Sequence, residues 1–228
     1  KADRGVRPGL RKRLLRHLGL TIALHLGAET AIEEPMAAHP IRRYGDPILR
    51  AKGAPVREFG TALWDLGDAM LASMRAAKGI GLAAPQVGLS LQLFVVNVHD
   101  EDFKPTLDGK VVDPEEIMPM LFANAKVTVP AGEGEIYTEG CLSFPSITGD
   151  VERVEKAIVQ FRDADGAPHT LECEGLLARC VQHEHDHCQG VLFIDRMTRA
   201  HQLLTATKVK KLLRATTAEL KAAKKPKG

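Results

Sequence analysis

Two histidines and a glutamate in one short segment are the residues of this sequence best suited to chemistry. The segment His183-Glu184-His185-Asp186-His187 is an HExxH element. On a helix, residues four positions apart lie on the same face, so His183 and His187 could ligate one metal ion. Glu184 is then placed to act as a general base toward water at that metal. The element predicts a metal-dependent hydrolase, and the rest of the chain decides which kind.

The third metal ligand distinguishes the protein classes that use this element. One class of zinc peptidase takes it from a downstream Glu, but the only Glu after His187 is Glu219, in the basic tail. The metzincin pattern requires a histidine where this chain has Phe193. Cys141 is a better candidate for the third ligand, because a Cys/His/His set leaves a fourth coordination position open for water. The alternative for a lone cysteine is a small buried apolar residue, the interpretation favoured for Cys173, Cys180 and Cys188.

A glycine-rich segment at 79–88 is the third candidate for chemistry. Its two glycines and two alanines at 79–84 permit an extended backbone to approach closely, and Gln86 offers a neutral amide donor to a carbonyl oxygen. A phosphate-binding loop is disfavoured because no Lys-Ser/Thr pair follows. A simple Gly/Pro turn is the remaining alternative.

The hydrophobic pattern predicts the elements that position these residues. Helical periodicity indicates a helix over 61–77 and another over 175–188 that carries the HExxH element and ends at Gly190. A last helix is expected over 199–220, with Val209, Leu212, Leu213 and Leu220 on one side. Strands are expected over 91–98, 121–129, 134–139, 156–162 and 169–174, with a hairpin turn at 163–166 and a loop over 101–118. Strands first and the main helices at the ends favour an α+β fold.

Composition excludes several function classes. Lys+Arg 31 against Asp+Glu 29 gives a net charge of +2, and one Trp with two Tyr argues against a base-stacking nucleic-acid surface. No apolar run reaches the roughly 18 residues that a membrane span needs. Four cysteines without a CxxC pair indicate a reducing compartment with free or metal-bound thiols.

Positive charge is concentrated at the two ends of the chain. Residues 1–20 contain seven basic residues and one acid, and residues 208–228 contain eight and one. We expect a leader over 1–35, disordered or a non-native start, with Met36 as a natural start and an organelle transit peptide as the less favoured alternative. A globular domain then spans 36–197, and a basic helix and tail span 198–228.

Three segments in this order resemble those of the peptide deformylases: GIGLAAPQ at 79–86, EGCLS at 139–143 and QHEHDH at 182–187. The likeness extends from about His39 to Arg196. It implies mixed or antiparallel sheets packed around a central HExxH helix, followed by a C-terminal helix. It also implies the activity, because this family removes the formyl group from the N-terminal formyl-methionine of nascent chains and releases formate. A bacterial-type, cytoplasmic location is the corresponding expectation.

The resemblance also implies the metal and its ligands. Cys141, His183 and His187 would bind it. The family works best with Fe(II), and Zn(II), Ni(II) or Co(II) can occupy the same ligand set.

The same resemblance assigns the catalytic groups. Glu184 would take a proton from water and return it to the leaving amine. The Gln86 side-chain amide and the backbone N–H of Leu142 would receive the developing oxyanion. The substrate peptide would lie extended, pairing with the backbone near Gly81 and Glu139.

An apolar pocket is expected for the methionine side chain of the substrate. The candidates are Ile80, Tyr137, Leu176 and Cys180, since Leu176 and Cys180 share the helix face of His183 and Tyr137 alternates in phase with Cys141. Arg179 is expected at the rim of this pocket.

Two supporting interactions are expected around the ligands. Glu139 and Arg153 would form an ion pair that steadies the cysteine loop, and Asp186 would orient a ligand histidine. A solvated surface charge is the alternative for each. His185, which points away from the ligand face, is expected to be exposed.

Some segments depart from the family pattern. Residues 122–126 replace a more usual Asn-Pro-Glu strand, which puts the local strand geometry in doubt, and Cys188 stands where Leu is common. The 35-residue leader is not a family feature. The basic C-terminal helix suits docking on the ribosome through phosphate contacts, with a solvated tail as the alternative.

Two other functions compete with deformylation. An HExxH metallopeptidase is disfavoured by the missing downstream Glu or His. A non-catalytic relative that keeps the fold on the ribosome is disfavoured because Gln86, Cys141, Glu184 and both histidines are intact. No membrane contact and no sequence-specific nucleic-acid binding are expected.

Overall fold

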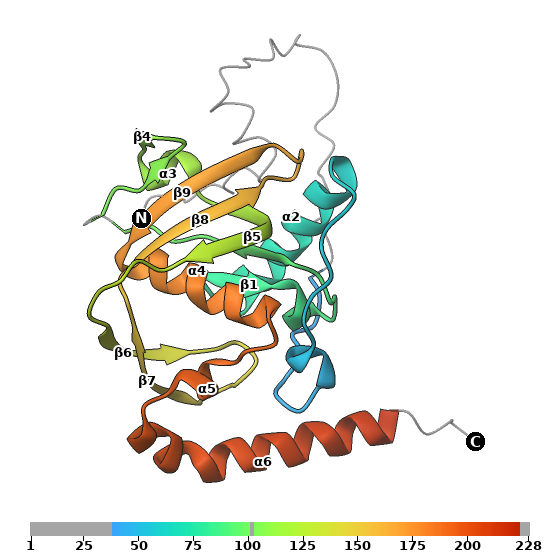
Figure 1. Ribbon diagram of the computed structural model, residues 1–228. Coiled ribbons are helices and arrows are strands. Elements are labelled where there is room, and N and C mark those ends of the chain that lie inside the picture. The colour runs from blue at the N-terminus through green and yellow to red at the C-terminus, as the bar shows by residue number, and fades with distance from the viewer. Residues whose placement is uncertain (1–37, 101–102, 224–228) are drawn as a thin grey trace, which may run out of the picture.

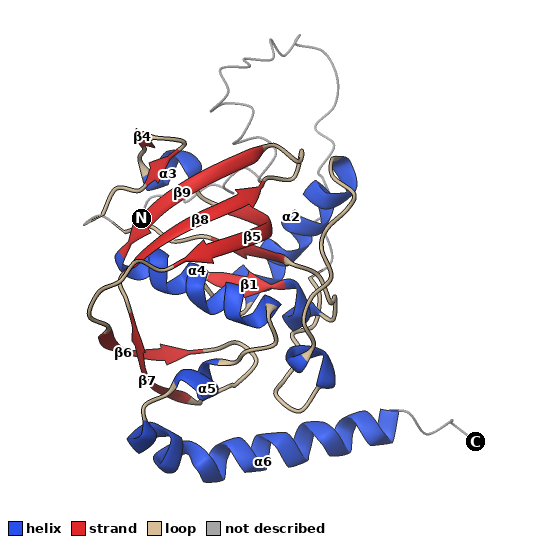
Figure 2. Ribbon diagram, viewed as in Figure 1, coloured by secondary structure: helices blue, strands red, loops and turns tan. Residues whose placement is uncertain are grey.

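A central helix, α4 (Gly175–Cys188), lies between a large sheet and a small one (Figure 1). The computed structural model describes residues 38–100 and 103–223. The leader expected over 1–35 and the natural start expected at Met36 lie outside the described residues. Helices and antiparallel sheets of both sizes are present, as Figure 2 shows, so the predicted α+β class is confirmed.

The large sheet has seven strands in the order β1-β2-β5-β8-β9-β3-β4, and its neighbouring strands pair antiparallel. Its strands are β1 (Gly81–Ala83), β2 (Leu93–Val96), β3 (Thr106–Leu107), β4 (Lys110–Val111), β5 (Met120–Thr128), β8 (Lys156–Arg162) and β9 (Pro168–Glu174). In β8, alternate residues are buried, which is the period-two signal from which the strand was predicted. The inner face of the sheet packs on α4, with Phe94, Phe122, Val159 and Leu171 in the core.

The small sheet consists of β6 (Glu135–Gly140) and β7 (Thr148–Arg153), paired antiparallel from Glu135↔Arg153 to Gly140↔Thr148. Strand β6 was predicted, and β7 was not. In β7 the buried face is formed by Gly149, Val151 and Arg153, so neither the glycine nor the arginine gives an apolar alternation in the sequence.

The segment expected to be a loop over 101–118 contains short regular elements. Strands β3 and β4 form a hairpin, and α3 (Pro114–Ile117) follows with Asp113 at its N-cap, where the carboxylate accepts from the backbone N–H of Glu115 at 2.9 Å. An Asp followed by Pro is a helix-start signal, so this turn could have been predicted. The three-residue β1 was also missed, since Gly-Leu-Ala has little strand character.

Residues 122–126 form part of β5 but shift its register with β8 between Ala123 and Lys126. Asn124 adopts a left-handed backbone conformation, with φ of 54°. Its side-chain oxygen accepts from the N–H of Val56 at 2.8 Å, and its amide donates to the Val56 carbonyl at 2.9 Å. This departure from the family pattern therefore bends the strand locally and connects it to the preceding segment.

The remaining helices pack around the two sheets, and the one at 61–76 covers the face of the large sheet opposite α4, where Met70 and Met74 lie in one cluster with Val95 and Leu121. They are η1 (Pro47–Arg50), α2 (Thr61–Ala76), η2 (Ala84–Val87), α5 (Phe193–Arg196) and α6 (Arg199–Ala223). Helix α6 runs below the small sheet in Figure 1 and buries Thr205 and Thr216, while Val209 and Leu212 pack against an apolar cluster of the domain. Leu213, expected on the same side, is 39% exposed. Among the helices of the described ranges, none is both long and apolar enough to cross a membrane.

Candidate metal and active site

Three ligand groups converge where α4 passes the end of β6. The ligand atoms of Cys141, His183 and His187 all lie within 4.8 Å of one another. Cys141 directly follows β6, and its Sγ is 3.2 Å from Nε2 of His187. The two histidines share one face of α4, as their spacing predicts, with ring centroids 5.1 Å apart. Within residues 38–100 and 103–223 this is the one cluster of Cys, His, Asp or Glu suited to a metal ion.

Unpaired and charged groups at this cluster fit a divalent cation. Oε2 of Glu184 is buried without a hydrogen-bond partner, and Nε2 of His187 faces Sγ of Cys141. Burial, followed by the neighbouring imidazole, lowers the pKa of His187 well below its usual value, so the ring is held in the neutral form that a metal requires. Burial also lowers the pKa of His183, but contacts with Cys141 and Glu139 outweigh it and raise the pKa well above normal. The site therefore favours positive charge between Cys141 and Glu139.

Glu184 lies beside the ligand atoms in an almost water-free position. Its side chain is 5% exposed, and burial is the main cause that raises the pKa of its carboxyl to about 7. Gly81 makes this position possible, because a Cβ there would lie 2.5 Å from Oε1 of Glu184 and 2.8 Å from Sγ of Cys180. A carboxyl with a pKa near neutrality is suited to exchange protons in both directions.

Gln86 directs its amide N–H groups at the same cluster. Its oxygen accepts from the backbone N–H of Ala83 at 2.8 Å, which leaves Nε2 to donate to Oγ of Ser143 at 3.3 Å and to approach Sγ of Cys141 at 3.6 Å. Leu142 follows the cysteine and lines the same cavity. The side chain of Leu142 packs so closely on Gly79 that a Cβ at Gly79 would be 2.7 Å from it.

Glu139, and not Asp186, is the carboxylate that contacts a histidine of the cluster. Its Oε2 contacts Nδ1 of His183 at 2.9 Å, and it accepts from Nε of Arg153 at 2.7 Å and from Nη1 of Arg179 at 3.1 Å. Burial raises the pKa of Glu139, but hydrogen bonds from His183 and Arg153 outweigh it and lower the pKa to about 2. The expected ion pair of Glu139 with Arg153 is thus present, as part of a buried network.

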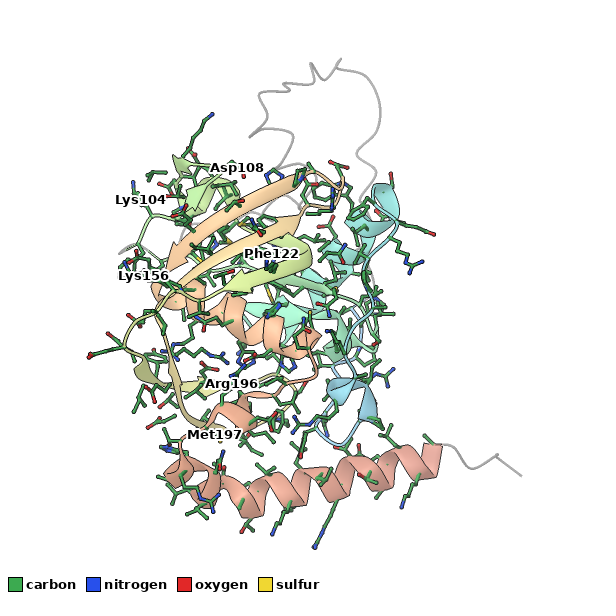
Figure 3. All side chains as sticks on the ribbon, viewed as in Figure 1. Lys104, Asp108, Phe122, Lys156, Arg196 and Met197 are labelled. Carbon is green, nitrogen blue, oxygen red and sulfur yellow. The ribbon has the colours of Figure 1, made fainter. Side chains whose placement is uncertain are left out.

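Asp186 contacts arginines instead of a ligand histidine. Nη1 of Arg153 donates to it at 2.9 Å and Nη2 of Arg196 at 2.8 Å. Figure 3 labels Arg196, which reaches Asp186 from the end of α5. Arg153 and Arg196 occupy the carboxylate of Asp186, and Glu139 already contacts Nδ1 of His183. The prediction that Asp186 orients a ligand histidine is wrong; it supports Arg153, which supports Glu139.

A cavity of about 610 Å³ opens at the cluster and contains every residue predicted for the substrate. Gly81 and Glu139 line it from β1 and β6, two strands whose outer edges are unpaired within the described sheets. Ile80, Tyr137, Leu176 and Cys180 also line it. The segment at 144–148, which leads into β7, and Lys78, which lies between α2 and β1, also line the cavity and were not predicted to do so.

Two charged residues near the cavity differ from prediction. Arg179 lines the cavity but is only 5% exposed, because its guanidinium also donates to the carbonyls of Val151 and Glu135 at 3.1 and 3.0 Å. It is a buried support and not an exposed rim residue. His185 is partly buried, with Nε2 3.4 Å from the amide nitrogen of Gln189, because the end of α4 is covered on that side too.

Phe193 is a site neighbour that was noted only as a missing ligand. It occupies the sequence position of the third metzincin histidine, and its ring lies 6.1 Å from that of His183 at an angle of 35°. The geometry therefore brings this position beside the ligands but fills it with an apolar ring. An open Cys/His/His donor set next to a buried carboxylate and an amide donor is characteristic of a metal-dependent hydrolase.

Comparisons with known proteins identify the family. The profile of the polypeptide deformylase family matches residues 38–203. A peptide deformylase of Opitutus terrae is 48% identical over 185 residues, which cover 79% of this chain and 96% of the relative. The solved structure of the peptide deformylase from Thermus thermophilus superposes with a TM-score of 0.65 at 36% identity, covering 78% of this chain and 99% of that one. A Synechococcus elongatus peptide deformylase in complex with actinonin gives 0.62 at 35% identity, covering 83% and 91%.

The chain belongs to the polypeptide deformylase family. The family and the enzyme class expected from the three sequence motifs are thereby confirmed, as is metal dependence. Its reaction is hydrolytic removal of the N-formyl group from nascent peptides.

Proposed function

We propose that Cys141, His183 and His187 hold the metal and that the cavity beside them is the deformylation site. The observation that carries this assignment is the convergence of the three ligand atoms within 4.8 Å, with Cys141 and His183 lining the cavity. A divalent metal bound there would make water more acidic and polarise the formyl carbonyl. We further propose Fe(II) as the native metal, with Zn(II), Ni(II) or Co(II) as possible substitutes in the same donor set.

Glu184 is the acid–base residue in this proposal. Its carboxylate takes a proton from the attacking water, and the same group delivers that proton to the amine that leaves the formyl carbon. Supporting evidence is its unpartnered Oε2 and the elevated pKa of about 7, which favours both protonation states near neutral pH.

Gln86 and Leu142 stabilise the oxyanion in this proposal. The Gln86 oxygen is fixed by the Ala83 N–H, so its amide nitrogen is directed toward Cys141 and Ser143 without rotation. A neutral donor of fixed orientation stabilises developing negative charge without the reorganisation that water needs. The N–H of Leu142, next to the ligand Cys141, supplies the second donor.

The formylated peptide lies extended between β1 and β6. Each of these strands presents an unpaired edge in the described sheets, and Gly81 and Glu139 line the cavity from the two sides. Backbone pairing with such an edge binds peptides with little dependence on sequence, while side-chain pockets give the selectivity. This matches an enzyme that acts on many nascent chains.

Formyl-Met and acetyl-Met tripeptides, given to anaerobically prepared Fe(II) protein, test the assignment. We expect formate from the first and no acetate from the second, and we expect Glu184→Ala to lower turnover by roughly 10²–10⁴-fold. Metal content should stay at the wild-type level, since Glu184 is not a ligand. Cleavage of internal peptide bonds would favour the metallopeptidase alternative. No metal-dependent turnover would favour the non-catalytic alternative.

We also propose a docking role for the C-terminal helix and a cytoplasmic location. In this division, residues 36–197 form the catalytic unit, and residues 198–228 contribute a basic helix and tail that contact ribosomal RNA. The exposed face of α6 carries Lys210, Lys211, Arg214 and Lys221, while Glu219 is the only acid after Asp195. Such an excess of cations suits a phosphate backbone.

A further inference from the structure

Large apolar side chains are exposed around one part of the cavity. Ile80 is 43% exposed, Leu176 is 40% exposed and Tyr137 is 59% exposed, and all three line the cavity together with the buried Cys180. Exposed apolar groups gathered at one hollow mark a binding site more often than chance exposure does. The proposed function assigns this hollow to the methionine side chain, and the present inference rests on that assignment.

The guanidinium of Arg179 lies over the ring of Tyr137 and holds it in place. The guanidinium carbon of Arg179 lies 5.4 Å from the ring centroid of Tyr137. Arg179 is itself fixed, because it donates to Glu139 and to the backbone carbonyls of Val151 and Glu135. Cation–π attraction therefore orients an aromatic side chain that would otherwise be free to rotate on an exposed strand.

The remaining surface of the ring is available to the substrate. Tyr137 is more than half exposed although Arg179 covers part of it, and it lines the cavity. A thioether makes a favourable contact with an aromatic ring at about 5 Å, often at the ring edge, and a methylene group of the same size lacks this interaction. Ile80 and Leu176 offer only apolar contact, which does not distinguish sulfur from carbon.

We propose that the Tyr137–Arg179 pair is a specificity determinant that recognises the sulfur atom of the substrate methionine. Tyr137 contacts the thioether, and Arg179 is the positioning residue that keeps the ring at the cavity. The hollow then selects methionine over norleucine, which has the same length and replaces the sulfur with a methylene.

The test compares formyl-Met-Ala-Ser with formyl-norleucyl-Ala-Ser on the metal-loaded enzyme. The measured quantity is the ratio of the two kcat/KM values, which cancels general effects on folding and metal content. From the strength of sulfur–aromatic contacts we expect Tyr137→Ile to lower the Met/norleucine ratio by roughly two- to tenfold. Tyr137→Phe retains the ring and should retain the ratio.

Two further variants separate the roles of the pair. Arg179→Met removes the cation and should lower the ratio toward that of Tyr137→Ile. Ile136→Ala changes the neighbouring exposed residue, which does not line the cavity, and should leave the ratio at the wild-type value.

The outcomes distinguish this inference from the proposed function. An unchanged ratio in Tyr137→Ile, with formate still released, overturns sulfur recognition and leaves deformylation intact. A wild-type ratio in Arg179→Met overturns the positioning role of the arginine. Absence of formate from both peptides with the wild-type enzyme overturns the proposed function itself.

Discussion

Glu139 connects the proposed metal ligand His183 to the rest of the fold. Its Oε2 contacts His183 and accepts from Arg153, its Oε1 accepts from Arg153 and Arg179, and it is only 6% exposed. A carboxylate bonded to the far nitrogen of a metal-binding imidazole fixes the ring orientation and increases its basicity. The same carboxylate forms ion pairs with two buried arginines, so it has a role in both binding and stability.

Glu139→Gln should weaken metal binding and destabilise the fold. The substitution keeps the shape but removes the charge, so we expect metal affinity to fall by roughly 10–100-fold. Loss of one partner in a buried ion pair should lower the free energy of unfolding by about 3–5 kcal/mol. Competition with a chelator, using Co(II), measures the first, and urea unfolding of the metal-free protein measures the second.

Glu135→Gln is the matched control for this variant, since Glu135 is an exposed carboxylate on the same strand. Its metal affinity and urea midpoint should equal those of the wild type. Wild-type metal affinity in Glu139→Gln would contradict the orienting role of Glu139.

The proposed metal ligands could be predicted from sequence because two of them obey a local rule. His183 and His187 are four residues apart, and the helix brings them together whatever surrounds it. The role of Glu139 could not be predicted in this way, because it depends on β6 lying against α4, residues that are 44 positions apart in the chain. Asp186 lies three residues after His183, and its local spacing could not show that Arg153 and Arg196 would engage its carboxylate instead.

At the scale of elements, β1 positions the catalytic carboxylate through its closeness to α4. Gly81 is the point of contact, because a Cβ there would overlap both Glu184 and Cys180. The structural requirement is space and not backbone strain, since the neighbouring atoms belong to buried side chains. The sequence suggested close approach at this segment but did not reveal that β1 is a strand.

Gly81→Ala should therefore reduce deformylation strongly. Displacement of Glu184 from its position would remove much of the roughly 10²–10⁴-fold contribution of general acid–base catalysis. Turnover of a formyl-Met peptide measures the effect. Gly132→Ala is the control, because a Cβ there meets only Val154 at an ordinary 3.5 Å. Equal turnover by the Gly81→Ala variant and the wild type would show that β1 can retreat without moving Glu184.

His169 connects the turn that follows β3 to the turn that follows β8 in the large sheet. His169 of β9 lies 2.7 Å from Asp108 and 3.2 Å from Asp163, which terminate the β3 and β8 strands. The hydrogen bond to Asp163 is the main cause that raises the pKa of His169 to about 9. A group with a raised pKa in the folded state stabilises that state while it is protonated there.

His169→Gln should consequently lower stability in a pH-dependent way. The stabilising contribution is fully present below pH 6.5, the usual pKa of histidine, and it is lost as the pH rises through about 9. The difference in Tm between the wild type and His169→Gln should thus be largest at pH 6 and close to zero at pH 10. A difference that is constant across this range would contradict protonation of His169 in the folded state.

At the scale of the whole molecule, helix α6 has an inner face that packs on the domain and an outer face that is exposed. Thr205 and Thr216 are buried, and Val209 and Leu212 contact the cluster that contains Phe144 and Phe193. The outer face is exposed and basic. The sequence predicted the helix and the apolar side from periodicity, but the exposure of Leu213 shows that a wide apolar stripe need not be covered completely.

The inner face complicates the simplest test of ribosome docking. Truncation after Met197 removes the basic face, and we expect it to weaken ribosome binding in a salt-dependent way while free formyl-peptides are still turned over. It also uncovers Phe144 and Phe193, whose neighbourhood includes the metal site. A variant that changes only the outer face is therefore sharper.

The triple variant Lys210→Glu/Lys211→Glu/Arg214→Glu reverses the charge of exposed side chains and leaves the inner face of α6 intact. If these cations contact RNA phosphates, ribosome affinity falls and the slope of log affinity against log salt decreases by roughly 0.7–0.9 per lost contact. Turnover of a free formyl-Met tripeptide should remain at the wild-type rate. The matched control, Lys104→Glu/Lys110→Glu/Lys126→Glu, changes the net charge equally at exposed positions; Figure 3 labels Lys104 at the opposite end of the molecule from α6. Equal loss of affinity in both triple variants would indicate a general charge effect and contradict docking through α6.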